Sequence, residues 1–151
     1  MKKLLLLLSL TSVLLAKQYT FLVDDYDKEL ELEAKIIFNI ATSSSQKPVR
    51  LFIPNMSVAE EKSFSRYFTI SKDCENANFV YVKKSVEIDH KCYNKKRLFF
   101  TNNYEKLLSD TKFYGAFFWN KSRPNIVFIK NRLTKDNIQL PNTYQKYVED
   151  F

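Results

Sequence analysis

Residues 48–54, with the sequence Pro-Val-Arg-Leu-Phe-Ile-Pro, form an apolar run bracketed by prolines, which is typical of a β-strand. Ser57 and Glu60 follow in the spacing of a capping box, which predicts a helix from residue 58 to about residue 67. Phe79-Val80-Tyr81-Val82 is a second run of strand type, and Thr69-Ile70 is compatible with a very short strand. This alternation favours parallel strand pairing, with helices on the faces of the sheet.

An amphipathic helix is expected upstream of this unit, over residues 27–42. Leu30, Ala34, Ile37 and Ala41 recur at spacings of four, three and four, which places them on one helix face.

The downstream half predicts further strands and a hairpin. The expected elements are a strand over residues 97–101, a short helix over 104–108, strands over 116–119 and 125–129, and a short helix from Pro141. Five polar residues separate the last two strands, which indicates a hairpin. We therefore expect a single small α/β domain. Its sheet should be mixed, mostly parallel and Rossmann-like, flanked by helices, with a C-terminal antiparallel hairpin.

The first 16 residues have the pattern of a secretory signal peptide. Lys2 and Lys3 precede a mostly apolar run that ends at Ala16, and this run is shorter than the roughly twenty residues of a membrane span. Cleavage after Ala16 is expected, with an uncleaved anchor as the alternative. Residues 17–151 would then be the mature domain, in the periplasm of a double-membraned bacterium or outside the cell.

Charge and glycine content limit the partners. The chain has 24 Lys or Arg and 17 Asp or Glu. Removing residues 1–16 takes away two lysines, which leaves 22 basic against 17 acidic residues and a formal charge of +5. This modest, scattered charge on an exported protein does not favour nucleic acid as a partner. Gly115 is the only glycine, so glycine-rich phosphate-binding loops are excluded, and no cofactor is expected.

Cys74 and Cys92 are the only cysteines, and an even count in an exported chain indicates a disulfide. The bond would enclose the strand at residues 79–82 and stabilise the fold by about 3 kcal/mol in the chain-entropy model. A metal site formed with His90 and Asp89 is the less favoured alternative, because structural zinc sites take four closely spaced ligands.

No arrangement for nucleophilic catalysis is recognisable. His90 is the only histidine and no nucleophile motif surrounds a serine. The carboxylate pairs Asp24/Asp25 and Glu60/Glu61 lie at expected helix starts, where capping explains them. The chain is therefore not expected to be an enzyme.

Consecutive aromatic residues at 117–119 suggest a second role for one sheet face. Phe117 and Trp119 share a face of their strand, because side chains alternate along it. Either helices cover both faces of the sheet, or Phe117 and Trp119 form a surface for a partner or a second copy.

Three segments, with the order of the elements, resemble the YfiR-type family of small periplasmic proteins. Residues 31–41 are similar to the opening helix of the family, residues 77–85 to its central strand, and residues 115–133 to its hairpin and the basic-leucine step that follows. Residues 140–147 look like its terminal helix. The resemblance covers roughly residues 27–149.

The resemblance implies a regulator rather than an enzyme. The best-known type of the family binds the periplasmic part of an inner-membrane diguanylate cyclase and holds it inactive, and members tend to form homodimers. It also implies that the Cys74–Cys92 disulfide senses redox state, whereas the residues themselves indicate only a structural bond. The alternative function is a periplasmic module that binds a small molecule.

Overall fold

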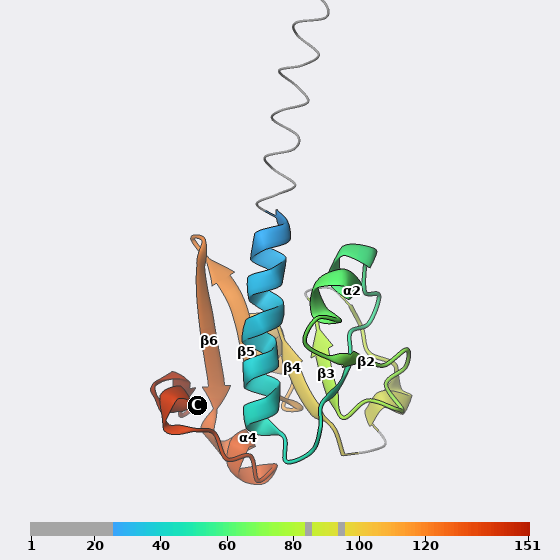
Figure 1. Ribbon diagram of the computed structural model, residues 1–151. Coiled ribbons are helices and arrows are strands. Elements are labelled where there is room, and N and C mark those ends of the chain that lie inside the picture. The colour runs from blue at the N-terminus through green and yellow to red at the C-terminus, as the bar shows by residue number, and fades with distance from the viewer. Residues whose placement is uncertain (1–25, 84–85, 94–95) are drawn as a thin grey trace, which may run out of the picture.

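A seven-stranded sheet in the order β2-β1-β3-β4-β5-β6-β7 runs through the protein (Figure 1). The computed structural model describes residues 26–83, 86–93 and 96–151, and the predicted signal peptide lies outside them. The first described helix covers residues 26–44 and is called helix 26–44 below. The strands are β1 (Arg50–Phe52), β2 (Thr69–Ile70), β3 (Phe79–Val82), β4 (Leu98–Thr101), β5 (Phe113–Asn120), β6 (Arg123–Ile129) and β7 (Val148–Glu149). The remaining helices are α2 (Val58–Phe64), α3 (Tyr104–Ser109) and α4 (Lys130–Lys135), with 3-10 helices η1 (His90–Tyr93) and η2 (Asn142–Tyr147).

Parallel pairing joins the first five strands, and β5 and β6 form an antiparallel hairpin. The α/β class, the mostly parallel sheet and the hairpin predicted from the sequence are thereby confirmed. Central strand β3 pairs with β1 on one side and, residue for residue, with β4 on the other. All four of its side chains are buried, as expected of a parallel strand that is covered on both faces.

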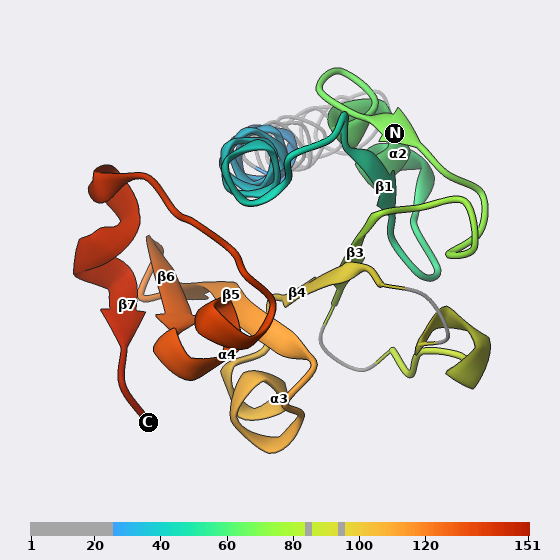
Figure 2. The same ribbon diagram turned by 90° about the horizontal axis from the view of Figure 1, so that it is seen from below.

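Helices cover both faces of the sheet (Figure 2). Helix 26–44 and α2 lie on one face, and α3 lies on the other. Phe79 and Tyr81 belong to the apolar cluster under helix 26–44, while Val80 and Val82 belong to the cluster under α3. The alternation of side chains along β3 therefore divides the core into two layers.

The predicted helix signals are largely correct. The four residues predicted to share the apolar face of helix 26–44 are at most 4% exposed, because that face packs on the sheet. Ser57 and Glu60 form both bonds of the capping box, although α2 ends at Phe64 rather than near residue 67. The Asn103 side chain caps α3 by accepting from the backbone N–H groups of Glu105 and Lys106.

The C-terminal region differs from the prediction. The predicted five-residue hairpin loop is a two-residue turn at Lys121-Ser122, because polar residues on both sides of it continue the exposed ends of β5 and β6. Helix α4 was not predicted; no side chain caps its start. The expected terminal helix is the 3-10 helix η2, after which β7 pairs in parallel with β6.

Gly115 lies at a β-bulge between β4 and β5. The register shifts there, so that Phe99 pairs with Phe113 and Phe100 pairs with Gly115. A Cβ atom at position 115 would lie 2.6 Å from the Phe100 ring and 2.8 Å from both the Phe128 ring and the Val127 carbonyl oxygen. The glycine therefore permits close packing of aromatic rings over the middle of the sheet.

We predict that Gly115→Ala destabilises the fold by about 1–3 kcal/mol, because the added methyl group overpacks a site that contains a backbone oxygen. Urea unfolding, monitored by fluorescence of the single tryptophan, measures the change. An unchanged or higher midpoint would contradict the packing described for this bulge.

Candidate functional site

Charged side chains meet near the carboxyl end of β3. Strand β2 follows β1 in the chain and lies on one side of it in the sheet, whereas β3 lies on the other side of β1. The strand order therefore reverses direction between β1 and β3. In open α/β sheets, ligands bind outside the carboxyl ends of the strands at such a switch point. The carboxyl end of β3 is therefore the first place to look for a site.

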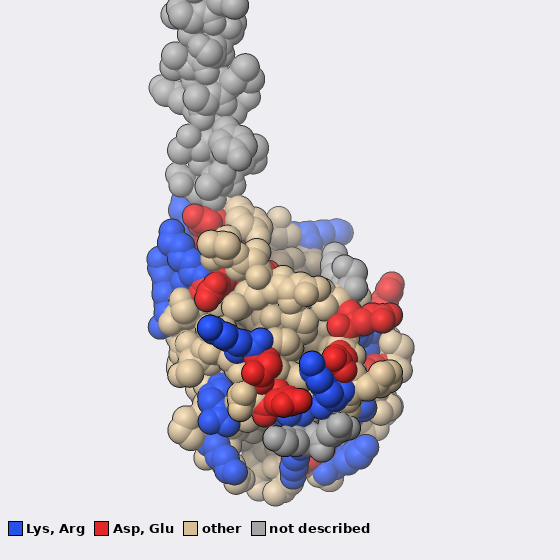
Figure 3. Space-filling view, turned by 90° about the vertical axis from the view of Figure 1, so that its right-hand side faces the viewer, with Lys and Arg blue, Asp and Glu red and all other residues tan. Residues whose placement is uncertain are grey.

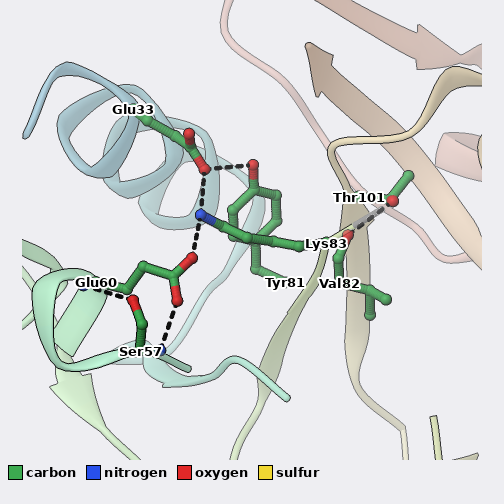
Figure 4. A network of polar contacts seen from close by, with 7 residues as sticks. All are labelled: Glu33, Ser57, Glu60, Tyr81, Val82, Lys83 and Thr101. Atoms are coloured by element: carbon green, nitrogen blue, oxygen red, sulfur yellow. Dashed lines mark hydrogen bonds and ion pairs between the residues drawn. The ribbon is translucent and has the colours of Figure 1, made fainter. Parts of the chain in front are cut away.

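A lysine held between two glutamates occupies this position (Figure 4). Lys83 Nζ lies 3.0 Å from Glu33 Oε1 and 2.6 Å from Glu60 Oε1. The Tyr81 hydroxyl donates to Glu33 Oε1 at 2.9 Å, and the Ser57 backbone N–H donates to Glu60 Oε2 at 2.6 Å. We call Glu33, Glu60, Tyr81 and Lys83 the polar network.

Three elements bring these side chains together. Tyr81 and Lys83 are two residues apart on the path of β3, so both point toward the face that carries helix 26–44. Glu33 belongs to that helix, and Glu60 belongs to the first turn of α2. Lys83 Nζ also lies 5.6 Å from the centre of the Phe64 ring, within reach of a cation–π interaction. The network thus joins a helix, a helix N-terminus and the central strand.

The pKa values of Glu60, Lys83 and Tyr81 depart from their ordinary values. Burial raises the pKa of Glu60, but hydrogen bonds from Lys83 and from the Ser57 backbone outweigh it, so the pKa lies below its ordinary value. Burial lowers the pKa of Lys83, but the carboxylates of Glu33 and Glu60 raise it by more. Burial, with the Glu33 charge second, raises the pKa of Tyr81 well above its ordinary value.

These shifts are the opposite of those that acid–base catalysis uses. A general acid or base works best with a pKa near the working pH. Here the pKa values of Glu60 and Lys83 move away from neutrality, so both groups stay charged and paired. The arrangement is suited to fixing α2 and helix 26–44 against β3 rather than to moving protons.

The predicted disulfide is present and joins the segments before and after β3. Cys74 and Cys92 are bonded, both are buried, and the bond encloses β3 as expected. Arg97, which is 8% exposed, reinforces the closure by donating to the carbonyl oxygens of Cys92 and Ala77. The two loops that flank β3 are therefore tied by a covalent bond and by one guanidinium group.

A cavity of about 240 Å³ lies beside the disulfide, at the carboxyl ends of β1 and β2. Its lining combines apolar side chains with charges of both signs, among them Phe52, Ile88, Lys72, Asp73, Glu87 and Lys91. The neighbouring surface is also mixed, since Lys and Arg lie next to Asp and Glu over much of the side that carries α2 (Figure 3). The volume is below the 300–1,000 Å³ of common ligand pockets.

The other predicted site residues lie elsewhere. His90 and Asp89 are exposed, and in the described part of the chain no group of three or more potential ligands could hold a metal ion. Phe117 is fully buried beneath Trp119, with ring centres 5.5 Å apart, so it offers no surface to a partner. Trp119 is only partly buried and reaches the surface.

Sequence reasoning missed the polar network as a unit. Glu60 was recognised only as a capping residue, and Glu33 and Lys83 were not singled out. One signal was available in the sequence. Side chains alternate along β3, so Lys83, which directly follows this apolar strand, lies on the same face as Tyr81. The glutamate partners come from 50 and 23 residues upstream of Lys83, and no local pattern relates them.

None of the described helices combines the length and the apolar composition that a membrane crossing requires. Comparisons with models of protein families, with curated proteins and with solved structures find no match for this chain.

We predict that Lys83→Met lowers the free energy of unfolding by about 3 kcal/mol, because it leaves the buried Glu33 carboxylate and the partly buried Glu60 carboxylate without their cation. Lys130→Met is the matched control, since the Lys130–Asp150 pair is exposed and should contribute less than about 1 kcal/mol. Urea unfolding measures both. Converting both glutamates to glutamine in the Lys83→Met background should restore most of the loss. Equal effects of Lys83→Met and Lys130→Met would contradict the role assigned to the network.

The network also predicts a pH dependence. Glu60 has a lowered pKa in the folded state, so its stabilising contribution is present above the ordinary value of 4.5 and is lost as the pH falls through the lower, folded value. The stability difference between the parent protein and Glu60→Gln should therefore shrink from about pH 6 to about pH 3. Glu61→Gln, at an exposed neighbouring position, is the control. A difference that is constant with pH would show that Glu60 does not act as a paired carboxylate.

Proposed function

We propose that this protein is an exported, non-catalytic regulator that binds another protein. The observation that carries the proposal is the polar network at the topological switch point. Where α/β folds hold ligands or reactive groups, this chain places its own ion pairs, with pKa values displaced from neutrality. A domain that pairs its own charges at this position is better suited to presenting a surface than to converting a substrate.

The disulfide supports the proposed location. Disulfides persist in oxidising compartments such as the bacterial periplasm, and Cys74–Cys92 is consistent with export through residues 1–16. If this bond also senses redox state, as the family resemblance implies, its reduction potential should lie above about −300 mV. A lower potential would leave it a purely structural bond.

The family resemblance suggests the class of partner. In the YfiR-type family, the bound protein is the periplasmic part of an inner-membrane diguanylate cyclase. The order of elements that carried the resemblance is compatible with the sheet, in which the central strand precedes an antiparallel hairpin. A signalling protein of the inner membrane with a periplasmic domain is therefore the proposed partner, with a homodimer as a further assembly.

A small-molecule-binding module is the second candidate, and one observation favours it. The cavity beside the disulfide lies at the carboxyl ends of β1 and β2 and combines apolar and charged side chains. Its volume of about 240 Å³ would admit only a small polar molecule. We rank this function second because the cavity is small.

The test is crosslinking in cells of the tagged, exported protein, followed by mass spectrometry of the captured proteins. We expect one inner-membrane protein with a periplasmic signalling domain. A variant that lacks residues 2–16, and so stays in the cytoplasm, is the control for nonspecific capture. Recovery of the protein's own copies alone would contradict the regulator and would direct the next experiment to small-molecule ligands of the cavity.

A further inference from the structure

The outer half of the β5–β6 hairpin extends beyond the rest of the sheet. Strand β4 pairs with β5 only as far as Ala116, and β7 pairs with β6 only at Phe128 and Ile129. Residues 117–120 and 123–126 thus form a two-stranded ribbon, which we call the hairpin arm, and no third strand pairs with it in the described part of the chain. In Figure 1 the arm points toward the same end of the molecule as the start of helix 26–44.

Aromatic contacts hold the arm in place. Phe117 is fully buried on the face of helix 26–44 and packs under Trp119. Phe118 packs on the opposite face against Tyr104 of α3, with ring centres 5.5 Å apart. A two-stranded ribbon alone is marginally stable in water, so these contacts give the arm a fixed direction.

The hairpin arm carries charge of one sign. Residues 117–126 contain Lys121 and Arg123 and no Asp or Glu, in contrast to the mixed charges on the side that carries α2. At the far end of the two strands, Lys130 pairs with Asp150, and Arg132 donates to three backbone carbonyl oxygens. Lys121 and Arg123 at the tip are exposed and form no ion pair among the described residues. With Asn120 and Asn125 they line a surface hollow of about 500 Å³.

The turn at the tip is conformationally strained. Lys121 and Ser122 have φ values of 48° and 60°, in the left-handed region where two-residue hairpin turns favour Asn-Gly. A residue with a side chain costs roughly 1–2 kcal/mol in this conformation. This turn places Lys121 at the exposed tip of the hairpin arm.

The composition of the arm fits a protein surface better than a lipid surface. Trp and Arg are among the residues that contribute most at protein interfaces, and guanidinium groups pair with carboxylates in a fixed geometry. A tip that inserts into a membrane interface presents apolar side chains. Residues 120–123, Asn-Lys-Ser-Arg, present none.

We propose that the hairpin arm is the surface through which this protein binds its partner, and that the partner presents a cluster of Asp and Glu side chains. Lys121 and Arg123 pair with the carboxylates, Asn120 and Asn125 donate hydrogen bonds beside them, and the exposed part of Trp119 packs at the base of the contact. This inference rests on the proposed function, because it identifies the face of the regulator that the partner contacts.

The test uses purified protein, residues 17–151, titrated with poly-L-glutamate as the probe. Trp119 is the only tryptophan, so its fluorescence reports binding at the arm directly. We expect Lys121→Glu/Arg123→Glu to weaken binding at least about ten-fold, and the control Lys47→Glu/Lys135→Glu, with the same change of charge at exposed positions elsewhere, to weaken it less than about two-fold. Lys121→Gln/Arg123→Gln serves if charge reversal perturbs folding.

Equal weakening by the arm and control variants would overturn the proposal, because it would show attraction to overall charge alone. Absence of binding would overturn it too. A third outcome is that the protein binds phosphatidylglycerol vesicles through the arm more tightly than it binds poly-L-glutamate. That result would overturn the acidic protein as the proposed partner and identify a lipid surface in its place. The titration needs no cellular partner, so a negative titration does not affect the crosslinking result. Capture of a signalling protein through another face would support the proposed function and contradict the proposed surface.

Discussion

Complete burial of β3 is the constraint on which the rest of this structure depends. Because all four of its side chains are buried, each face of the sheet needs a cover, and the covers must be fixed in place. The polar network does this on one face, where Lys83 joins helix 26–44 to α2. On the other side, the disulfide and Arg97 secure the loops that lead into and out of the strand.

Two regions at the carboxyl end of the parallel strands have different roles under this constraint. At the carboxyl end of β3, Lys83 pairs with Glu33 and Glu60 within the chain. In the hairpin arm, by contrast, charges of one sign face outward from a ribbon held by Phe117 and Phe118. In the proposed regulator, the charges of the polar network would therefore be paired within the chain, and the charges of the hairpin arm would be accessible to a partner.

Local patterns predicted much of the fold and little of the candidate site. Strand β3, the capping box at Ser57 and the Cys74–Cys92 pairing were predictable, because each depends on neighbouring residues or on a unique pair. Helix α4 has no side-chain cap, and β7 exists only because it pairs with β6, so neither leaves a local signal. The polar network joins residues that are distant in the chain, and only the folded topology brings Glu33 to Lys83.

The late position of β7 in the chain has a consequence for how the molecule is assembled. Residues 128–129 of β6 stay unpaired on one side until residues 148–149 reach them, and the Lys130–Asp150 ion pair lies beside the same place. An open strand edge is a template for pairing with other chains. In a chain that folds from its start, these two residues of β6 would therefore offer an unpaired edge until β7 is added.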